Sequence, residues 1–248
     1  MTGNPFAASG NPTMRDQVWM DNATTDPNVM TLSGTINKCI FLFALVVVFA
    51  GIGWNAIAVH PQFAYTIFAV GVIGGLTLAL IASFSPKSSP VVAPIYAVCK
   101  GVLLGALSMF YETVYPGIVF NAVMVTLGVF AMMLALYKVK ALRVTPAFTK
   151  GVMAATGAVM LVYLCSITMS LFGGRMPYLH DSGPLGIGIS LVIVGIAALK
   201  LVIDFHVIEQ GAATGQAKYM EWYGAFALTV TIIWLYLEIL RLLSKLRR

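Results

Sequence analysis

Residues 39–86 read CIFLFALVVVFAGIGWNAIAVHPQFAYTIFAVGVIGGLTLALIASFSP and contain no Asp, Glu, Lys or Arg. A helix needs roughly 20 mainly apolar residues to cross the hydrocarbon of a bilayer, so this stretch is long enough for two crossings. The pair His60-Pro61 interrupts the stretch and predicts a turn there. Because lipid offers no partner to an unpaired backbone group, both segments should cross as helices.

Four further stretches lack these charges, and the composition agrees with a membrane location. They are residues 113–137, 151–174, 182–199 and 222–237. Of 248 residues, 59% are apolar and 10% are charged, and the mean hydropathy is +0.90, which is too apolar for an ordinary soluble domain. Apolar runs between turn signals predict seven spans: Ile36–Val59, Phe63–Phe84, Val91–Tyr111, Gly117–Tyr137, Thr149–Phe172, Leu185–Ile208 and Ala225–Leu243.

We therefore expect an all-α polytopic membrane protein, with a flexible polar N-terminal tail at residues 1–33 and one seven-helix domain at residues 34–248. The tail lacks the basic stretch followed by an apolar run that marks a cleavable signal. The connections are short, so consecutive helices should pack as antiparallel hairpins. Glycines at helical spacing, such as Gly101 and Gly105, indicate close helix packing, either inside the bundle or between two copies.

Basic residues are distributed unevenly between the two sides of the predicted bundle. The first, third and fifth loops hold a single base, Arg175. The N-terminal tail with the second, fourth and sixth loops holds eight: Arg15, Lys38, Lys87, Lys138, Lys140, Arg143, Lys150 and Lys218. Cytoplasmic loops are enriched in Lys and Arg, so the N-terminus should be cytoplasmic. If all seven segments cross, the basic residues Lys245, Arg247 and Arg248 at the C-terminal end lie on the side away from the cytoplasm, which disagrees with this rule. Either late charges are tolerated there, or the last segment does not cross completely.

Several classes of function are disfavoured by the sequence. The bases that produce the net charge of +6 are scattered at span edges, so the expected partner is the lipid bilayer and not nucleic acid. The cysteines Cys39, Cys99 and Cys165 stand alone, without metal-ligand spacing. The chain has no Gly-x-Ser-x-Gly turn, His-Glu-x-x-His helix or phosphate-binding glycine loop. We expect neither an enzyme nor a bound cofactor.

Two carboxylates within the last two spans are the main functional candidates. Asp204 lies near the end of the sixth span, one helical turn after Lys200, and Glu238 lies deep in the last span, three residues before Arg241. Charges at such depth are costly and usually face the bundle interior or a water-filled cavity. Asp204 and Glu238 could share a proton and sense pH, with calcium competing for their oxygens. Alternatively, each carboxylate forms only a local ion pair with its neighbouring base.

Four other side chains are secondary candidates. Glu112, Glu209 and Glu221 lie near predicted membrane boundaries, where a solvated or headgroup-facing carboxylate is the ordinary interpretation. His206 lies close enough in sequence to Asp204 to influence it. The three histidines are too dispersed to predict a metal site.

The segment Leu235-Tyr236-Leu237-Glu238-Ile239-Leu240-Arg241-Leu242-Leu243, the Asp204-containing span and Tyr115-Pro116-Gly117-Ile118-Val119 resemble the Bax inhibitor-1/YccA family. The resemblance implies six helices around a central last helix, and an acidic pair that acts as a pH-sensitive latch for calcium leak. It assigns the two acidic positions to Asp204 and Glu238. The sequence has Glu where relatives often have Asp, and the second span lacks the counter-charge arginine of some relatives. Lys200 or Arg241 would then supply the counter-charge.

The start of the last helix decides whether these two carboxylates can meet. If the helix begins at Glu221, Glu238 lies 17 residues or about 26 Å further along, whereas Asp204 is only about 6 Å from the same membrane face. Contact would require residues 209–226 to form a loop or an extension outside the membrane, and so a short final segment.

Two functions follow as expectations. The first is a pH-responsive cation leak, with calcium as the expected ion, in which the Asp204–Glu238 site gates the flow. The second is a non-conducting protein that modulates other membrane proteins, such as a quality-control protease. The bacterial character of the resemblance, together with the lack of a targeting peptide, favours an inner or plasma membrane.

Overall fold

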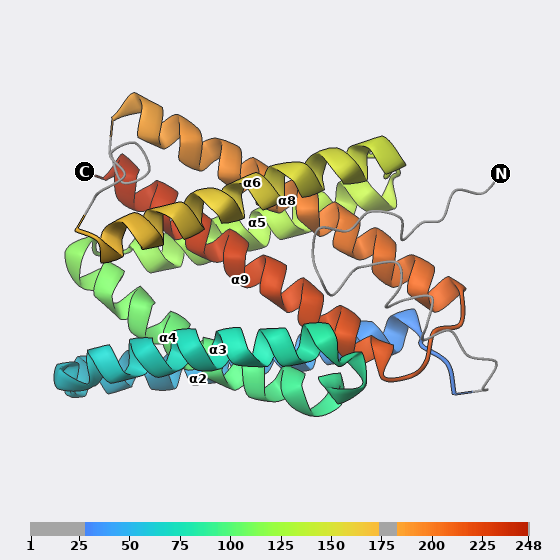
Figure 1. Cartoon of the computed structure of the whole chain (residues 1–248), viewed down its shortest axis with the longest axis horizontal. Helices are drawn as coiled ribbons and strands as arrows, with labels where there is room; N and C mark the ends of the chain where they lie inside the picture. The colour runs from blue at the N-terminus through green and yellow to red at the C-terminus, as the bar shows by residue number, and fades with distance from the viewer. Residues whose placement is uncertain (1–27, 174–182, 248) are drawn as a thin grey trace.

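The computed structural model describes residues 28–173 and 183–247. Seven long helices occupy these ranges, and each is long and apolar enough to cross a membrane (Figure 1). They are α2 (Leu32–Val59), α3 (Ala64–Phe84), α4 (Ser89–Val114), α5 (Ile118–Lys138), α6 (Pro146–Leu171), α8 (Pro184–Ala213) and α9 (Met220–Leu246). The predicted seven-span, all-α architecture is confirmed.

Helix boundaries follow the turn and cap residues of the sequence. Thr31 caps α2 by accepting a hydrogen bond from the Gly34 amide, and Thr145 caps α6 in the same way. Proline occupies the first turn of α6 and of α8, where its missing amide hydrogen costs nothing. Short 3₁₀ turns beginning at Pro61 and Pro86 connect α2 to α3 and α3 to α4. Consecutive helices therefore run in opposite directions, as predicted, but not every consecutive pair packs as the expected hairpin, because α2 packs mainly against α4 and not against α3.

The last helix lies at the centre of the molecule. Figure 1 shows α9 crossing diagonally between a layer containing α2, α3 and α4 and another containing α5, α6 and α8. It packs against α2, α4, α5 and α8, and it is the most extensively buried of the seven spans. The outer helices instead expose many apolar side chains, as lipid-facing helices do. Residues on α9 are thus the ones best shielded from lipid.

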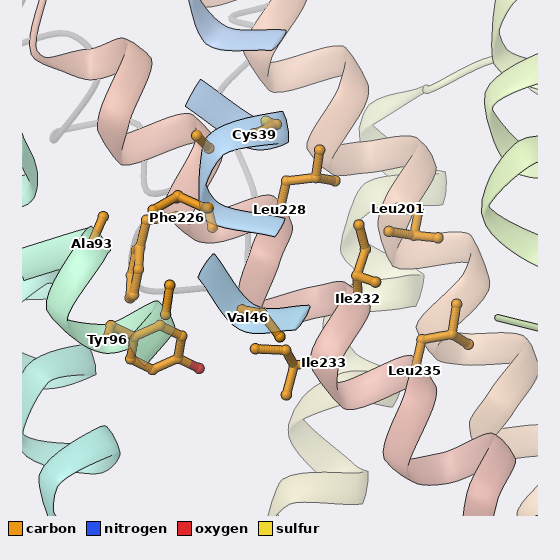
Figure 2. Packing of buried hydrophobic residues seen from close by; sticks show 14 of the residues in the cluster. Cys39, Val46, Ala93, Tyr96, Leu201, Phe226, Leu228, Ile232, Ile233 and Leu235 are labelled. Atoms are coloured by element: carbon orange, nitrogen blue, oxygen red, sulfur yellow. The ribbon is translucent and has the colours of Figure 1, made fainter. Parts of the chain in front are cut away.

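Close contacts around α9 involve both large and very small side chains. The Tyr96 ring of α4 meets the Phe226 ring of α9 edge to face, with 4.9 Å between the ring centroids (Figure 2). Nine residues further along α4, this helix and α2 approach so closely that a Cβ atom on Gly105 would lie 1.8 Å from the Ala50 carbonyl oxygen. Gly105, and Gly101 beside the Val46 carbonyl oxygen, therefore serve packing within one chain.

Two helix boundaries near the acidic residues differ from the sequence-based prediction. α8 continues to Ala213, so Asp204 lies nine residues before its end, where the predicted span placed it four before the end. α9 begins at Met220, so no long loop or separate extension precedes it. Because seven helices, an odd number, cross in alternating directions, the start of α2 and the end of α9 lie on opposite sides of the bundle. We call these the N-terminal and C-terminal sides.

Candidate functional site

α8 and α9 form an antiparallel pair whose register is defined by side-chain contacts. Thr231 Oγ1 of α9 donates to Asp204 Oδ2 of α8. Near the C-terminal side, Lys245 Nζ donates to Ser190 Oγ at 2.8 Å and to the Gly186 carbonyl at 3.0 Å. Because the two helices run antiparallel, the position of a residue in one helix relative to the other can be counted from the Asp204–Thr231 contact. Facing residues can be located from it.

Asp204 is a fully buried carboxylate with two protein partners. Lys200 Nζ donates to Oδ1 in an i,i+4 ion pair, and Thr231 donates to Oδ2. The exposed fractions are 0% for Asp204 and 3% for Lys200, so both charges are removed from lipid and water. Asp204 lies about 13.5 Å from the end of α8 at 1.5 Å per residue, within the spanning helix and not at its end. An ion pair so deep is costly to form and more costly to break.

Glu238 forms a second buried cluster nearer the C-terminal side. The Tyr163 hydroxyl of α6 lies 2.7 Å from Oε1 and 2.8 Å from Oε2. Trp234 Nε1 donates to Oε1 at 3.1 Å, and Arg241 Nη1 pairs with Oε2 at 3.1 Å. Arg241 also donates to the Tyr163 hydroxyl and stacks 4.8 Å from the centroid of its ring. The cluster thereby ties α6 to α9.

The expected direct pairing of Asp204 with Glu238 is absent from the contacts of the described residues. Each carboxylate has its own cation, as the alternative interpretation required. Glu238 lies seven residues beyond Thr231, or about 10.5 Å along α9. Because α9 is helical from Met220, it cannot bring Glu238 level with Asp204. The two carboxylates consequently do not form one shared calcium site in this structure.

Glu221, expected to be solvated or facing headgroups, is instead completely buried at 0% exposure. Its Oε1 accepts hydrogen bonds from the Thr31 amide and hydroxyl, both at 2.8 Å. Lys38 of α2 and Lys218 of the α8–α9 connection pair with the same carboxylate. Next to it, the Met30 amide donates to the Gln216 carbonyl at 2.6 Å. Glu221 therefore fastens the start of α2 to the start of α9.

Replacement of Glu221 by Gln should loosen this N-terminal anchor. The amide cannot form ion pairs with Lys38 and Lys218, and hydrogen bonds to charged groups contribute about 1.5–3 kcal/mol each. We expect the Met30 amide to exchange with deuterium about tenfold faster or more, since tenfold corresponds to about 1.4 kcal/mol. Glu209→Gln, which changes an exposed carboxylate, is the control. Unchanged exchange in Glu221→Gln would show that the carboxylate does not hold this segment.

The other secondary candidates have local partners. Glu112 accepts from the Gly117 and Val119 amides at 2.5 and 3.1 Å, and so caps the first turn of α5. Glu209 accepts a hydrogen bond from the Tyr137 hydroxyl. That hydroxyl also lies 3.4 Å from His206 Nδ1, so the histidine is directed towards α5. Within the described residues no hydrogen bond or ion pair joins His206 to Asp204, although only two positions separate them.

Sequence reasoning missed two residues of this region, Tyr163 and Thr231. Both lie in charge-free spans, where one hydroxyl gives no signal of its own. Both act as polar partners of a buried carboxylate, one from α6 and one from α9. A buried carboxylate in lipid requires such partners, but only the helix packing shows which residues supply them.

A protein-family model described as Bax inhibitor 1 like matches residues 11–248, which is nearly the whole chain. The chain belongs to the Bax inhibitor 1-like family. No curated protein and no solved structure matches it. The family assignment therefore rests on the family model, and it agrees with the seven membrane-spanning helices.

The motif that suggested the family has clear structural roles in this Bax inhibitor 1-like protein. In Leu235-Tyr236-Leu237-Glu238, Leu235 is fully buried, and the Tyr236 hydroxyl lies 2.6 Å from Ser108 Oγ of α4. Glu238 turns towards Tyr163 of α6. Neighbouring motif residues thus attach α9 to helices of both layers. The motif supports the central position of α9, in addition to supplying a carboxylate.

Proposed function

We propose that this Bax inhibitor 1-like protein is a pH-responsive leak pathway for cations, with calcium as the first cation to test. The observation that carries the proposal is the Asp204–Lys200 ion pair, buried within a membrane-spanning helix where α8 meets the central helix. Intramembrane charges usually mark ion or proton pathways, because their cost is otherwise difficult to explain. We place the N-terminal side in the cytoplasm of an inner or plasma membrane, because basic residues collect there.

Lys200 lies between the two carboxylates along the α8–α9 interface. The register places Lys200 opposite Leu235 and places Glu238 opposite Ala197, only three residues or about 4.5 Å from Lys200 along the helix axis. A lysine side chain is long and flexible enough to cover such a distance. The same ammonium group can therefore pair with Asp204 or move towards Glu238. Arg241 already neutralises Glu238 in the present arrangement.

Protonation of Asp204 is the step that connects this geometry to pH. A neutral Asp204 no longer attracts Lys200, so the ammonium moves towards Glu238 and one polar connection between α8 and α9 is lost. We infer that the ion-paired arrangement is closed and that loosening this connection admits cations along α9. The leak should then rise as the pH falls. Lys200 and Arg241 act as the counter-charges, and Asp204 and Glu238 as the pH-sensitive carboxylates.

Calcium flux into proteoliposomes tests the proposal. The purified protein is reconstituted around a calcium-sensitive dye, and flux is compared at about pH 6 and about pH 8, a window in which buried carboxylates can titrate. We expect more flux at the lower pH. Asp204→Asn, which cannot ionise, should remove most of the pH response, and Glu238→Gln should reduce it. Glu209→Gln, at an exposed position, should behave like the native chain.

Flux that equals that of protein-free liposomes at both pH values would overturn the leak proposal. The non-conducting alternative, a modulator of other membrane proteins, would then be favoured. Flux that is present but insensitive to pH and to both substitutions would keep a leak and remove the carboxylates as its sensor.

A further inference from the structure

Lys100 is a charged residue in the middle of α4 that none of the interactions above uses. It lies eleven residues after the start of α4, or about 16.5 Å along this 26-residue helix. Its neighbours one turn before and one turn after are Tyr96 and Leu104, which are 3% and 6% exposed. Residues four apart on a helix share a face, so Lys100 is on the inward face of α4. It is itself partly exposed.

The surroundings of Lys100 have room for the side chain but no acidic partner. Its stem lies across α3, where a Cβ atom on Gly75 would be 2.3 Å from Lys100 Cε and 2.7 Å from Nζ. Nζ lies 5.9 Å from the centroid of the Tyr96 ring. Among residues 28–173 and 183–247, no ion pair or hydrogen bond of Lys100 is present. Its positive charge is therefore not neutralised by a described side chain.

Lys100 lies at nearly the same depth as the proposed gate. Tyr96 meets Phe226 of α9, so Lys100, one turn further, is about level with Val230 and Thr231. Thr231 binds Asp204 from the other side of the central helix. Formal charges at this level are +1 for Lys100, +1 for Lys200 and −1 for Asp204, which sum to +1. A positive charge inside the membrane repels a passing cation.

We propose that Lys100 is a charge barrier that limits cation leak along α9 and so helps to set ion selectivity. The proposal rests on the proposed leak function. In the ion-paired state, Asp204 is compensated by Lys200, and the charge of Lys100 opposes cations at mid-depth. When Asp204 takes up a proton and Lys200 moves away, Lys100 keeps its charge, so the barrier still limits the cations that the gate admits. Lys100 is thus a selectivity-determining residue, separate from the gate itself.

Substitution of Lys100 by Met tests the barrier, because Met keeps an unbranched side chain over Gly75 and removes the charge. At an effective dielectric constant near 20, a positive unit charge about 10 Å from a cation lowers the rate at which that cation passes on the order of tenfold. In proteoliposomes at about pH 8, Lys100→Met should therefore raise the calcium leak on the order of tenfold and lower any chloride leak. Lys100→Arg, which stays charged, should resemble the native chain. Lys87→Met makes the same change at an exposed position and should have no effect.

The outcomes separate this inference from the proposed function. If native protein and Lys100→Met both leak no more than protein-free liposomes, the leak function itself fails. If the native protein leaks in a pH-dependent way but Lys100→Met leaves the calcium-to-chloride ratio unchanged, only the barrier is overturned. A rise in both calcium and chloride leak would indicate loosened packing and would also overturn it. A rise in calcium leak with a fall in chloride leak in Lys100→Met, together with native behaviour of Lys100→Arg, supports the barrier.

Discussion

Lys200→Met is expected to lower the free energy of unfolding in detergent by about 3–5 kcal/mol, which is the cost of leaving one buried charge without its partner. Asp204 would keep only the Thr231 hydroxyl and would have to take up a proton or remain an unpaired anion in the membrane. Thermal or denaturant unfolding of the purified protein measures the change. The same substitution at Lys150, which is exposed on α6, should have little effect.

A double substitution separates the ion pair from the packing. Replacing Lys200 by Met and Asp204 by Leu removes both charges and keeps similar volumes, so most of the lost stability should return. Equal destabilisation in the single and double variants would mean that side-chain packing, and not the unpaired charge, determines the effect. The double variant should also lack pH-dependent leak, because neither half of the proposed gate remains.

Gly105→Ala is expected to destabilise the protein by at least about 2 kcal/mol, although it adds a single methyl group. The new Cβ would lie 1.8 Å from the Ala50 carbonyl oxygen of α2, which is backbone and cannot rotate away. The two helices would have to separate, and their close packing would weaken along its length. The unfolding midpoint in detergent measures this loss.

Gly128→Ala provides the matched control for this change. Gly128 also lies within a spanning helix, α5, but a Cβ there has no atom within 4 Å. Its substitution should be neutral or stabilising by up to about 1 kcal/mol, because Ala favours the helix. Similar behaviour of the two variants would contradict the steric role of Gly105.

The seven spans, their antiparallel order and the family resemblance were all predictable from the sequence. Charge-free stretches as long as 39–86 can satisfy their backbone in lipid only as helices, and prolines at 61, 86 and 146 mark the turns. The two local ion pairs were also predictable from the sequence. Lys200 with Asp204 and Glu238 with Arg241 have helical spacings that allow local pairing before any tertiary contact forms.

Lys100 was visible in the sequence as the single charge within the predicted span Val91–Tyr111. Its inward position was not, because a helix face is defined only by what packs on it. Glu221 shows the same difficulty. Its position at a span boundary suggested solvent, whereas its four donors come from residues 31, 38 and 218. The contacts from residues 31 and 38 join segments that are 190 and 183 positions apart.

For the last helix, the sequence and the tertiary structure determine different features. Sequence alone determined that a last apolar segment exists, because its length and composition suit lipid. Tertiary structure decided that it starts at Met220, lies centrally and keeps Asp204 and Glu238 in separate ion pairs. It also provided partners for the basic end, since Lys245 binds α8 and Arg247 donates to the Pro116 carbonyl. Such choices depend on helix register and on side-chain partners from distant segments, which local hydrophobicity does not encode.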